Sequence, residues 1–256
     1  MMVAVVTSVE GAALEDLVRD LRDLRPAGID IEVGGNAGAA VDTVDGIASG
    51  VVPALIFVFV GSYLILLLTF GSVFLPLKAI FMTLLSIGAS LGALVLVFQD
   101  GIGESLLGFQ ASGEIISTTP ILMFCILFGL SMDYEVLMLS RIQEEYLRTG
   151  DNRASVARGL EQTAKVVTGA ALIMVVVFGG FMLADIVIIK SMGFGLALAV
   201  LIDATIVRGL LVPATMRLMG RWNWWAPDWI TRIVQRVGLG HAEVAAPSSA
   251  SAFAAD

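Results

Sequence analysis

The sequence predicts a membrane protein of the all-α class, with a five-helix transmembrane bundle preceded by a small α/β fragment. Of its 256 residues, 57% are hydrophobic and 15% are charged, and the mean hydropathy is +0.91. A soluble domain is about 45–50% apolar and about 25% charged. Five apolar runs are each long enough to cross a bilayer, whereas the first 49 residues mix short apolar runs with charges.

Residues 1–49 have the pattern of a strand, a helix and a second strand. Residues 3–6 form a short β-like run. The pattern continues with leucines at helical spacing and with an alternating apolar run: Leu14, Leu17, Leu21 and Leu24, then Ile29, Ile31 and Val33. So short a segment rarely buries enough apolar surface to fold alone. We therefore expect it to complete a sheet supplied by another part of the protein.

The five apolar runs are 51–70, 79–98, 115–139, 166–189 and 192–212. At 1.5 Å per residue, each covers a hydrocarbon core about 30 Å thick. The runs are too long and too evenly apolar to alternate as barrel strands, so they are predicted to be helices. Together they place a transmembrane domain at residues 50–219.

The basic residues of the connecting segments predict the orientation. They follow the first, third and fifth runs and fall on one side of the membrane: Lys78; Arg141, Arg148, Arg153, Arg158 and Lys165; and Arg217, Arg221, Arg232 and Arg236. Such a bias marks the cytoplasmic side. We expect a multi-pass plasma-membrane protein with an extracytoplasmic N-terminus and a cytoplasmic C-terminus.

Three polar segments complete the predicted organisation. Residues 141–165 are expected to form two short cytoplasmic helices, with Gly150 ending the first and Asp151 or Asn152 capping the second. Residues 220–241 contain all four tryptophans beside arginines, which is typical of an interfacial anchor. Residues 242–256 are rich in Ala, Ser and Pro and are expected to be disordered.

The composition argues against several classes of function. The single cysteine and single histidine cannot build a disulfide scaffold or a His-rich zinc site. A net charge of −8 argues against nucleic acid as a partner. No His-Glu-x-x-His or complete dinucleotide-binding glycine motif occurs. We therefore expect neither an enzyme nor a cofactor or metal.

The informative residues are the ionisable ones inside the spans, because each costs about 2.5–3.5 kcal/mol to insert. Asp133 and Asp203 are predicted to lie within the third and fifth spans and to carry protons, with Tyr134 and Arg208 tuning them. Glu135 is expected to reach the cytoplasmic interface, and Asp185 the opposite one.

Arg208 follows Asp203 by five residues, about 140° around an α-helix, so it is expected to reach a neighbouring helix instead. Two other interpretations of these residues remain. The buried groups can serve only to hold helices together. An intramembrane aspartyl protease would need a Gly-x-Gly-Asp context that neither aspartate has.

The segment FGLSMDYEV at 128–136, followed by LSRI at 139–142, resembles the signature helix of the MMPL (mycobacterial membrane protein large) branch of the resistance-nodulation-division transporters. Further similarity lies in LPLKA at 75–79, IDAT at 202–205 with Arg208, and NWW at 223–225. The resemblance runs from about Val3 to Trp229 and covers only the last part of that family's second half.

The resemblance implies a proton-motive-force-driven exporter of lipids or other hydrophobic compounds. Residues 1–49 would then end an extracytoplasmic porter domain. Asp133 and Tyr134 would form the proton relay, and Asp203 and Arg208 would match the ionisable pair of the last span. The implied partners are membrane lipids, protons, a hydrophobic or lipid substrate, and the N-terminal half of the transporter. The alternative is a non-transporting scaffold or truncated remnant that binds partner subunits.

Overall fold

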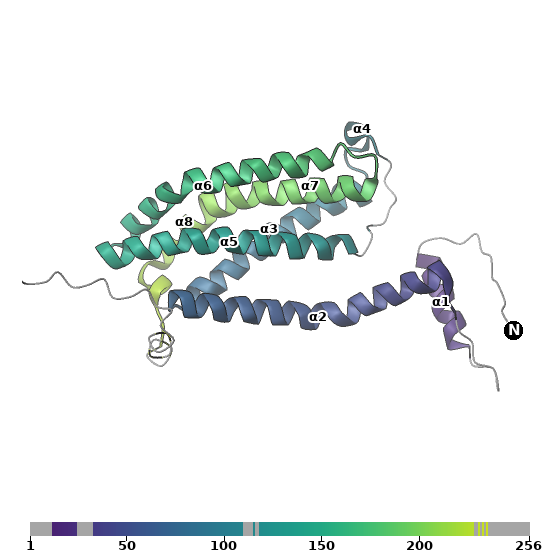
Figure 1. Ribbon diagram of the computed structural model, residues 1–256, viewed down its shortest axis with the longest axis horizontal. Coiled ribbons are helices and arrows are strands. Elements are labelled where there is room, and N and C mark those ends of the chain that lie inside the picture. The colour runs from purple at the N-terminus through teal and green to yellow at the C-terminus, as the bar shows by residue number, and fades with distance from the viewer. Residues whose placement is uncertain are drawn as a thin grey trace, which may run out of the picture. The chain divides into compact units, whose positions relative to one another are not determined.

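The computed structural model describes residues 12–24, 33–109, 115, 118–227, 230, 232 and 234. Within these residues every regular element is helical, and five helices are long and apolar enough to cross a membrane, which confirms the predicted helical bundle (Figure 1). The strands expected at residues 3–6 and at Ile29 and Ile31 lie outside the described residues. Val33, at the end of the second expected strand, has no regular structure.

The first compact unit covers residues 1–58. Helix α1 (Ala12–Asp23) confirms the helix predicted from the leucine spacing, and α2 (Gly35–Phe70) begins well before the predicted span. Arg22 joins the two helices by donating to both carboxylate oxygens of Asp42, at 2.5 and 3.1 Å, and to the carbonyl of Val33 at 3.0 Å. Helix α2 therefore starts within the segment expected to be soluble.

The second unit contains residues 59–256. After the end of α2, its α-helices are α3 (Phe74–Leu94), α4 (Glu104–Leu107), α5 (Thr118–Thr149), α6 (Asn152–Phe181), α7 (Val187–Ile202) and α8 (Val212–Met219). Two π-helical segments, η1 (Val95–Gln99) and η2 (Asp203–Leu211), continue α3 and α7, and a 3-10 helix, η3 (Gly220–Trp224), follows α8.

The long helices of this unit pack side by side. Helix α5 contacts α6, α6 contacts α7, and α3 contacts both α5 and α7 (Figure 1). A cluster of buried apolar side chains comes from α2, α3, α5, α6, η2 and α8: Leu66, Phe70, Leu75, Ala79, Met82, Met138, Leu139, Ile142, Val156, Val207, Val212 and Met216. This cluster fixes the positions of α5 and η2 relative to each other.

The two short helices predicted within 141–165 are parts of the long helices on either side. The first is the end of α5, which continues through Thr149 because no helix breaker occurs before Gly150, and the second is the start of α6, which begins at Asn152. The predicted boundary itself is confirmed. Gly150 has a φ of 68°, and the Asp151 carboxylate accepts from the first amides of α6 at 2.8 and 3.3 Å.

The tryptophan-rich segment has two kinds of tryptophan. Trp224 stacks on Tyr146 with ring centroids 4.5 Å apart and donates to the side-chain oxygen of Asn152 at 3.0 Å, so it packs against α5 and α6. Trp222 and Trp225 are exposed, and their interfacial role stays a prediction.

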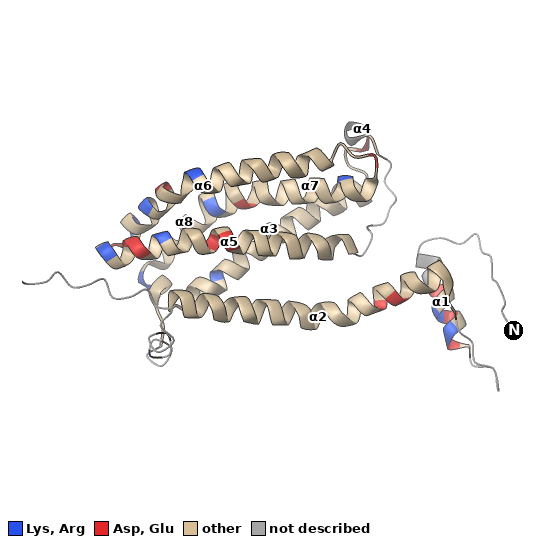
Figure 2. Cartoon of the chain, viewed as in Figure 1, with Lys and Arg blue, Asp and Glu red and all other residues tan. Residues whose placement is uncertain are grey.

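Basic residues gather where α5 ends and α6 begins (Figure 2). We call this the Arg-rich end of the bundle, and it contains Arg141, Arg148, Arg153 and Arg158.

Candidate functional site

The centre of the site is an ion pair within the π-helical segment η2. An Nη2 atom of Arg208 lies 2.8 Å from a carboxylate oxygen of Asp203, and the two side chains are 4% and 14% exposed. The prediction that Arg208 would not pair with Asp203 is wrong, because it assumed α-helical geometry. A π-helix hydrogen-bonds residue i to residue i+5, which brings positions 203 and 208 onto the same side.

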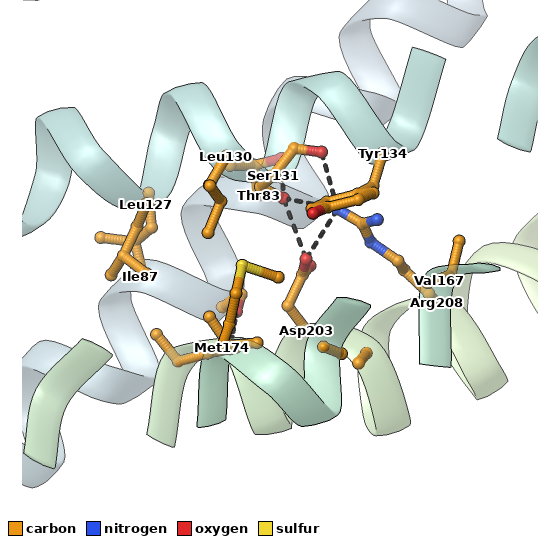
Figure 3. Close-up of a pocket in the computed structure, with 15 residues that line it drawn as sticks. Thr83, Ile87, Leu127, Leu130, Ser131, Tyr134, Val167, Met174, Asp203 and Arg208 are labelled. Atoms are coloured by element: carbon orange, nitrogen blue, oxygen red, sulfur yellow. Dashed lines mark hydrogen bonds and ion pairs between the residues drawn. The ribbon is translucent and has the colours of Figure 1, made fainter. Parts of the chain in front are cut away.

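The pair is tied to the neighbouring helix α5 through Ser131, which confirms that Arg208 also reaches another helix. Arg208 donates to the carbonyl and the hydroxyl of Ser131 at 2.6 and 3.2 Å, and the Ser131 hydroxyl donates to Asp203 at 3.1 Å (Figure 3). Thr83 of α3 lies 3.4 Å from the same hydroxyl. Three helical segments therefore meet at one buried polar cluster.

Tyr134 completes the surroundings of Arg208. The guanidinium carbon lies 5.3 Å from the centroid of the Tyr134 ring, within the range of a cation–π interaction. Ser131 and Tyr134 are three residues apart on α5 and so lie on neighbouring positions of one helix face. The structure thus brings together Tyr134, Asp203 and Arg208 of the four residues predicted from the sequence.

A pocket opens beside this cluster. Its walls are mostly apolar and come from α3, α5, α6, α7 and η2, with Leu127 and Met174 among the lining residues (Figure 3). Its polar groups come from six residues: Thr83, Ser86, Ser131, Tyr134, Asp203 and Arg208. The arrangement places a titratable carboxyl at an apolar cavity rather than in a sealed core.

Asp133 lies elsewhere. It is exposed on α5, so the bundle of this chain does not shield it as the sequence led us to expect. The reason is its angular position. Ser131, Glu135 and Met138 form a buried stripe on α5, and residue 133 is about 200° from residue 131 around the helix. Asp185 is also exposed, in the turn after α6.

Sequence reasoning missed two buried ionisable residues near the ion pair. Glu135 was expected to reach the cytoplasmic interface and Lys78 to lie in a connecting segment. Instead, Glu135 is 1% exposed on α5 and Lys78 is 8% exposed on α3. Glu135 interacts electrostatically with Arg208, Lys78 and Asp203. The four-residue spacing of Ser131 and Glu135 is the signal that could have placed Glu135 on the buried stripe.

The chemistry available at the site is proton binding. Among the described residues, no group of three or more His, Cys, Asp or Glu side chains could hold a metal ion. Arg208 stays charged, because a guanidinium does not lose its proton in proteins. The carboxyl of Asp203 is therefore the member of the pair that can change its charge.

The sequence is similar to those of known membrane proteins over most of its length. The sequence model of the MMPL family matches residues 5–239. A membrane protein of Streptomyces coelicolor is 46% identical over 230 residues, covering 90% of this chain and 32% of its own length.

Two mycobacterial relatives carry functional names. The heme uptake protein MmpL11 of Mycobacterium tuberculosis is 44% identical over 81% of this chain and 21% of its own length. The mycolic acid-containing lipids exporter MmpL11 of Mycolicibacterium smegmatis is 42% identical, with 81% and 22% covered. The chain thus spans between about a fifth and a third of the length of these relatives.

Proposed function

We propose that this chain, which belongs to the MMPL family, is the C-terminal portion of a proton-motive-force-driven exporter of lipids or other hydrophobic compounds. The names of the two mycobacterial relatives support a hydrophobic cargo. The partial coverage of every relative described above supports a larger transporter, in which the N-terminal half is a further partner. A transporter is also consistent with five long apolar helices and a buried ionisable pair in the same chain.

The observation that carries the proposal is the buried Asp203–Arg208 pair held to α5 by Ser131. In the proposed relay, a proton binds the Asp203 carboxylate and cancels its charge. Arg208 then loses its ionic partner but keeps its bond to the Ser131 carbonyl. The contact that holds positions 203 and 208 together is lost, so η2 is free to return to α-helical hydrogen bonding and to turn α8 against α5.

The membrane potential is large enough to drive such a step. One proton crossing the membrane supplies about 2.3 kcal/mol per 100 mV. A hydrogen bond between membrane helices contributes about 0.6 kcal/mol on average and about 1.7 kcal/mol at most. At 100 mV, one proton can therefore offset about one to three such contacts between η2 and α5.

Asp133 supports the proposal that the other half of the transporter covers this face of α5. A charged aspartate facing lipid at mid-span costs about 2.5–3.5 kcal/mol, so a protein partner is a more favourable neighbour than hydrocarbon. We propose that Asp133 and Tyr134 complete the relay against that partner. We keep the predicted orientation, with the Arg-rich end in the cytoplasm and residues 1–49 closing an extracytoplasmic porter domain.

Transport in reconstituted vesicles tests the function. The chain is inserted alone, or joined to the region that its relatives carry before it, and export of a labelled mycolate-type lipid is followed under an imposed proton gradient. We expect export only from the joined protein, with loss in the Asp203→Asn and Asp133→Asn variants and no change in Glu161→Gln, which replaces an exposed carboxyl on α6.

Each other result has a defined meaning. Transport of heme in place of lipid would keep the proton relay and change the cargo. Gradient-independent lipid movement, or full activity of the Asp203→Asn variant, would refute the relay. No transport by any form that inserts and folds would favour the scaffold alternative.

A further inference from the structure

Glu135 is the most deeply buried carboxyl among the described residues, and its surroundings leave it incompletely paired. The residue is 1% exposed, and its Oε1 atom has no hydrogen-bond partner. Burying a carboxyl without a partner is unfavourable, so a structural role alone does not account for the group.

Lys78 on α3 is the complementary group. It is 8% exposed, and its ammonium nitrogen also lacks a hydrogen-bond partner. The charged groups that act on Glu135 are Lys78 from α3, and Asp203 and Arg208 from η2. A buried acid and a buried base lie near one another, and neither is satisfied by the hydrogen bonds present.

The helix geometry places this pair next to the Asp203–Arg208 site. Ser131 and Thr83, which contact each other, mark the level of that site on α5 and α3. Glu135 lies four residues after Ser131, about 6 Å along α5, and Lys78 lies five residues before Thr83, about 7.5 Å along α3. Helix α5 ends at Thr149 and α3 begins at Phe74, so both steps lead towards the Arg-rich end.

The geometry points to Glu135, beside the buried Lys78, as a second proton-holding site of the relay, one step from Asp203 towards the Arg-rich end of the bundle. The inference rests on the proposed function. In the transfer, the O–H bond on the Asp203 carboxyl breaks and an O–H bond forms on Glu135, while Lys78 remains the fixed positive charge. No electrons are exchanged, and the proton then leaves Glu135 towards the Arg-rich end.

Infrared difference spectroscopy of the purified chain in lipid vesicles tests this directly, because a protonated buried carboxyl has its own C=O stretching band that shifts in heavy water. As the pH is lowered, we expect two such bands. Asp203→Asn should remove one and Glu135→Gln the other. The Glu161→Gln control should remove neither.

A double variant is the control for misfolding. Lys78→Met/Glu135→Gln removes both charges and leaves neither unpaired, so it should keep the helical circular dichroism spectrum and still lack the Glu135 band. Lys78→Met alone should keep the band but change the pH at which it appears, an effect that a purely structural Glu135 would not show.

The two claims fail separately. If Glu135→Gln leaves both bands in place and does not move the titration of Asp203, the second site is refuted while the Asp203 relay stands. If the Asp203 band never appears, the proposed function fails, and the Glu135 band still reports whether Glu135 takes up a proton.

Discussion

Replacing Arg208 with methionine measures how strongly the ion pair joins η2 to α5. Methionine keeps a long, flexible apolar side chain but removes the charge and every donor. The change deletes the 2.8 Å ion pair with Asp203 and two hydrogen bonds to Ser131, one of them 2.6 Å long. It also leaves the Asp203 carboxyl, only 14% exposed, without its counter-charge.

The expected loss of stability follows from that geometry. Breaking a buried ion pair by removing one partner costs about 3–5 kcal/mol, because the remaining charge is uncompensated. Ser131→Ala removes only hydroxyl hydrogen bonds and should cost about 0.6–1.7 kcal/mol. The Asp203→Asn/Arg208→Met double variant leaves no unpaired charge. It should therefore lose less unfolding free energy than Arg208→Met alone.

The measurement is reversible unfolding of the purified chain in mixed micelles, followed by circular dichroism as the fraction of denaturing detergent rises. If Arg208→Met lowers the unfolding free energy no more than Ser131→Ala does, the ion pair is not the contact that joins η2 to α5. The same conclusion follows if the double variant is as unstable as Arg208→Met.

Two further predictions concern the packing and the boundary of α6. In Gly159→Ala, the new Cβ would lie 2.5 Å from the Ile142 side chain and 2.9 Å from its backbone, so we expect a loss of about 1–3 kcal/mol. Gly169→Ala on the same helix has open space and should be neutral or stabilising by up to about 1 kcal/mol; equal melting shifts for the two would contradict the α5–α6 contact. Asp151→Ala removes the cap of α6 and should lower the unfolding free energy by about 1 kcal/mol. Asp151→Asn should recover most of that loss, and no recovery would mean that the cap is not responsible.

The sequence was sufficient for the spans because length and apolarity determine what can cross a bilayer. It was insufficient for the helix ends, because the polar residues up to Thr149 continue α5 beyond the apolar run, where hydropathy carries no signal. The boundary at Gly150 was predictable, because a glycine readily adopts the positive φ that ends a helix and an aspartate directly after it can cap the next helix.

The residues of the site were predicted in part, but their pairing and their directions around the helices were not. Asp203 and Arg208 were identified from their cost in the membrane, but their pairing depends on a π-helical segment that residue spacing does not reveal. Glu135 was misplaced because its position along the helix suggests the cytoplasmic interface, whereas its direction around the helix axis turns it into the bundle. Direction around the axis also explains why Asp133 is exposed although burial was expected.

The most direct test of the account is proton movement through the reconstituted transporter that contains this chain, read by a pH-sensitive dye inside the vesicles while lipid substrate is supplied. The account predicts substrate-dependent proton flux in the wild type and none in Asp203→Asn, although the variant inserts normally. Proton flux at the wild-type rate in Asp203→Asn would show that the buried pair does not carry the proton.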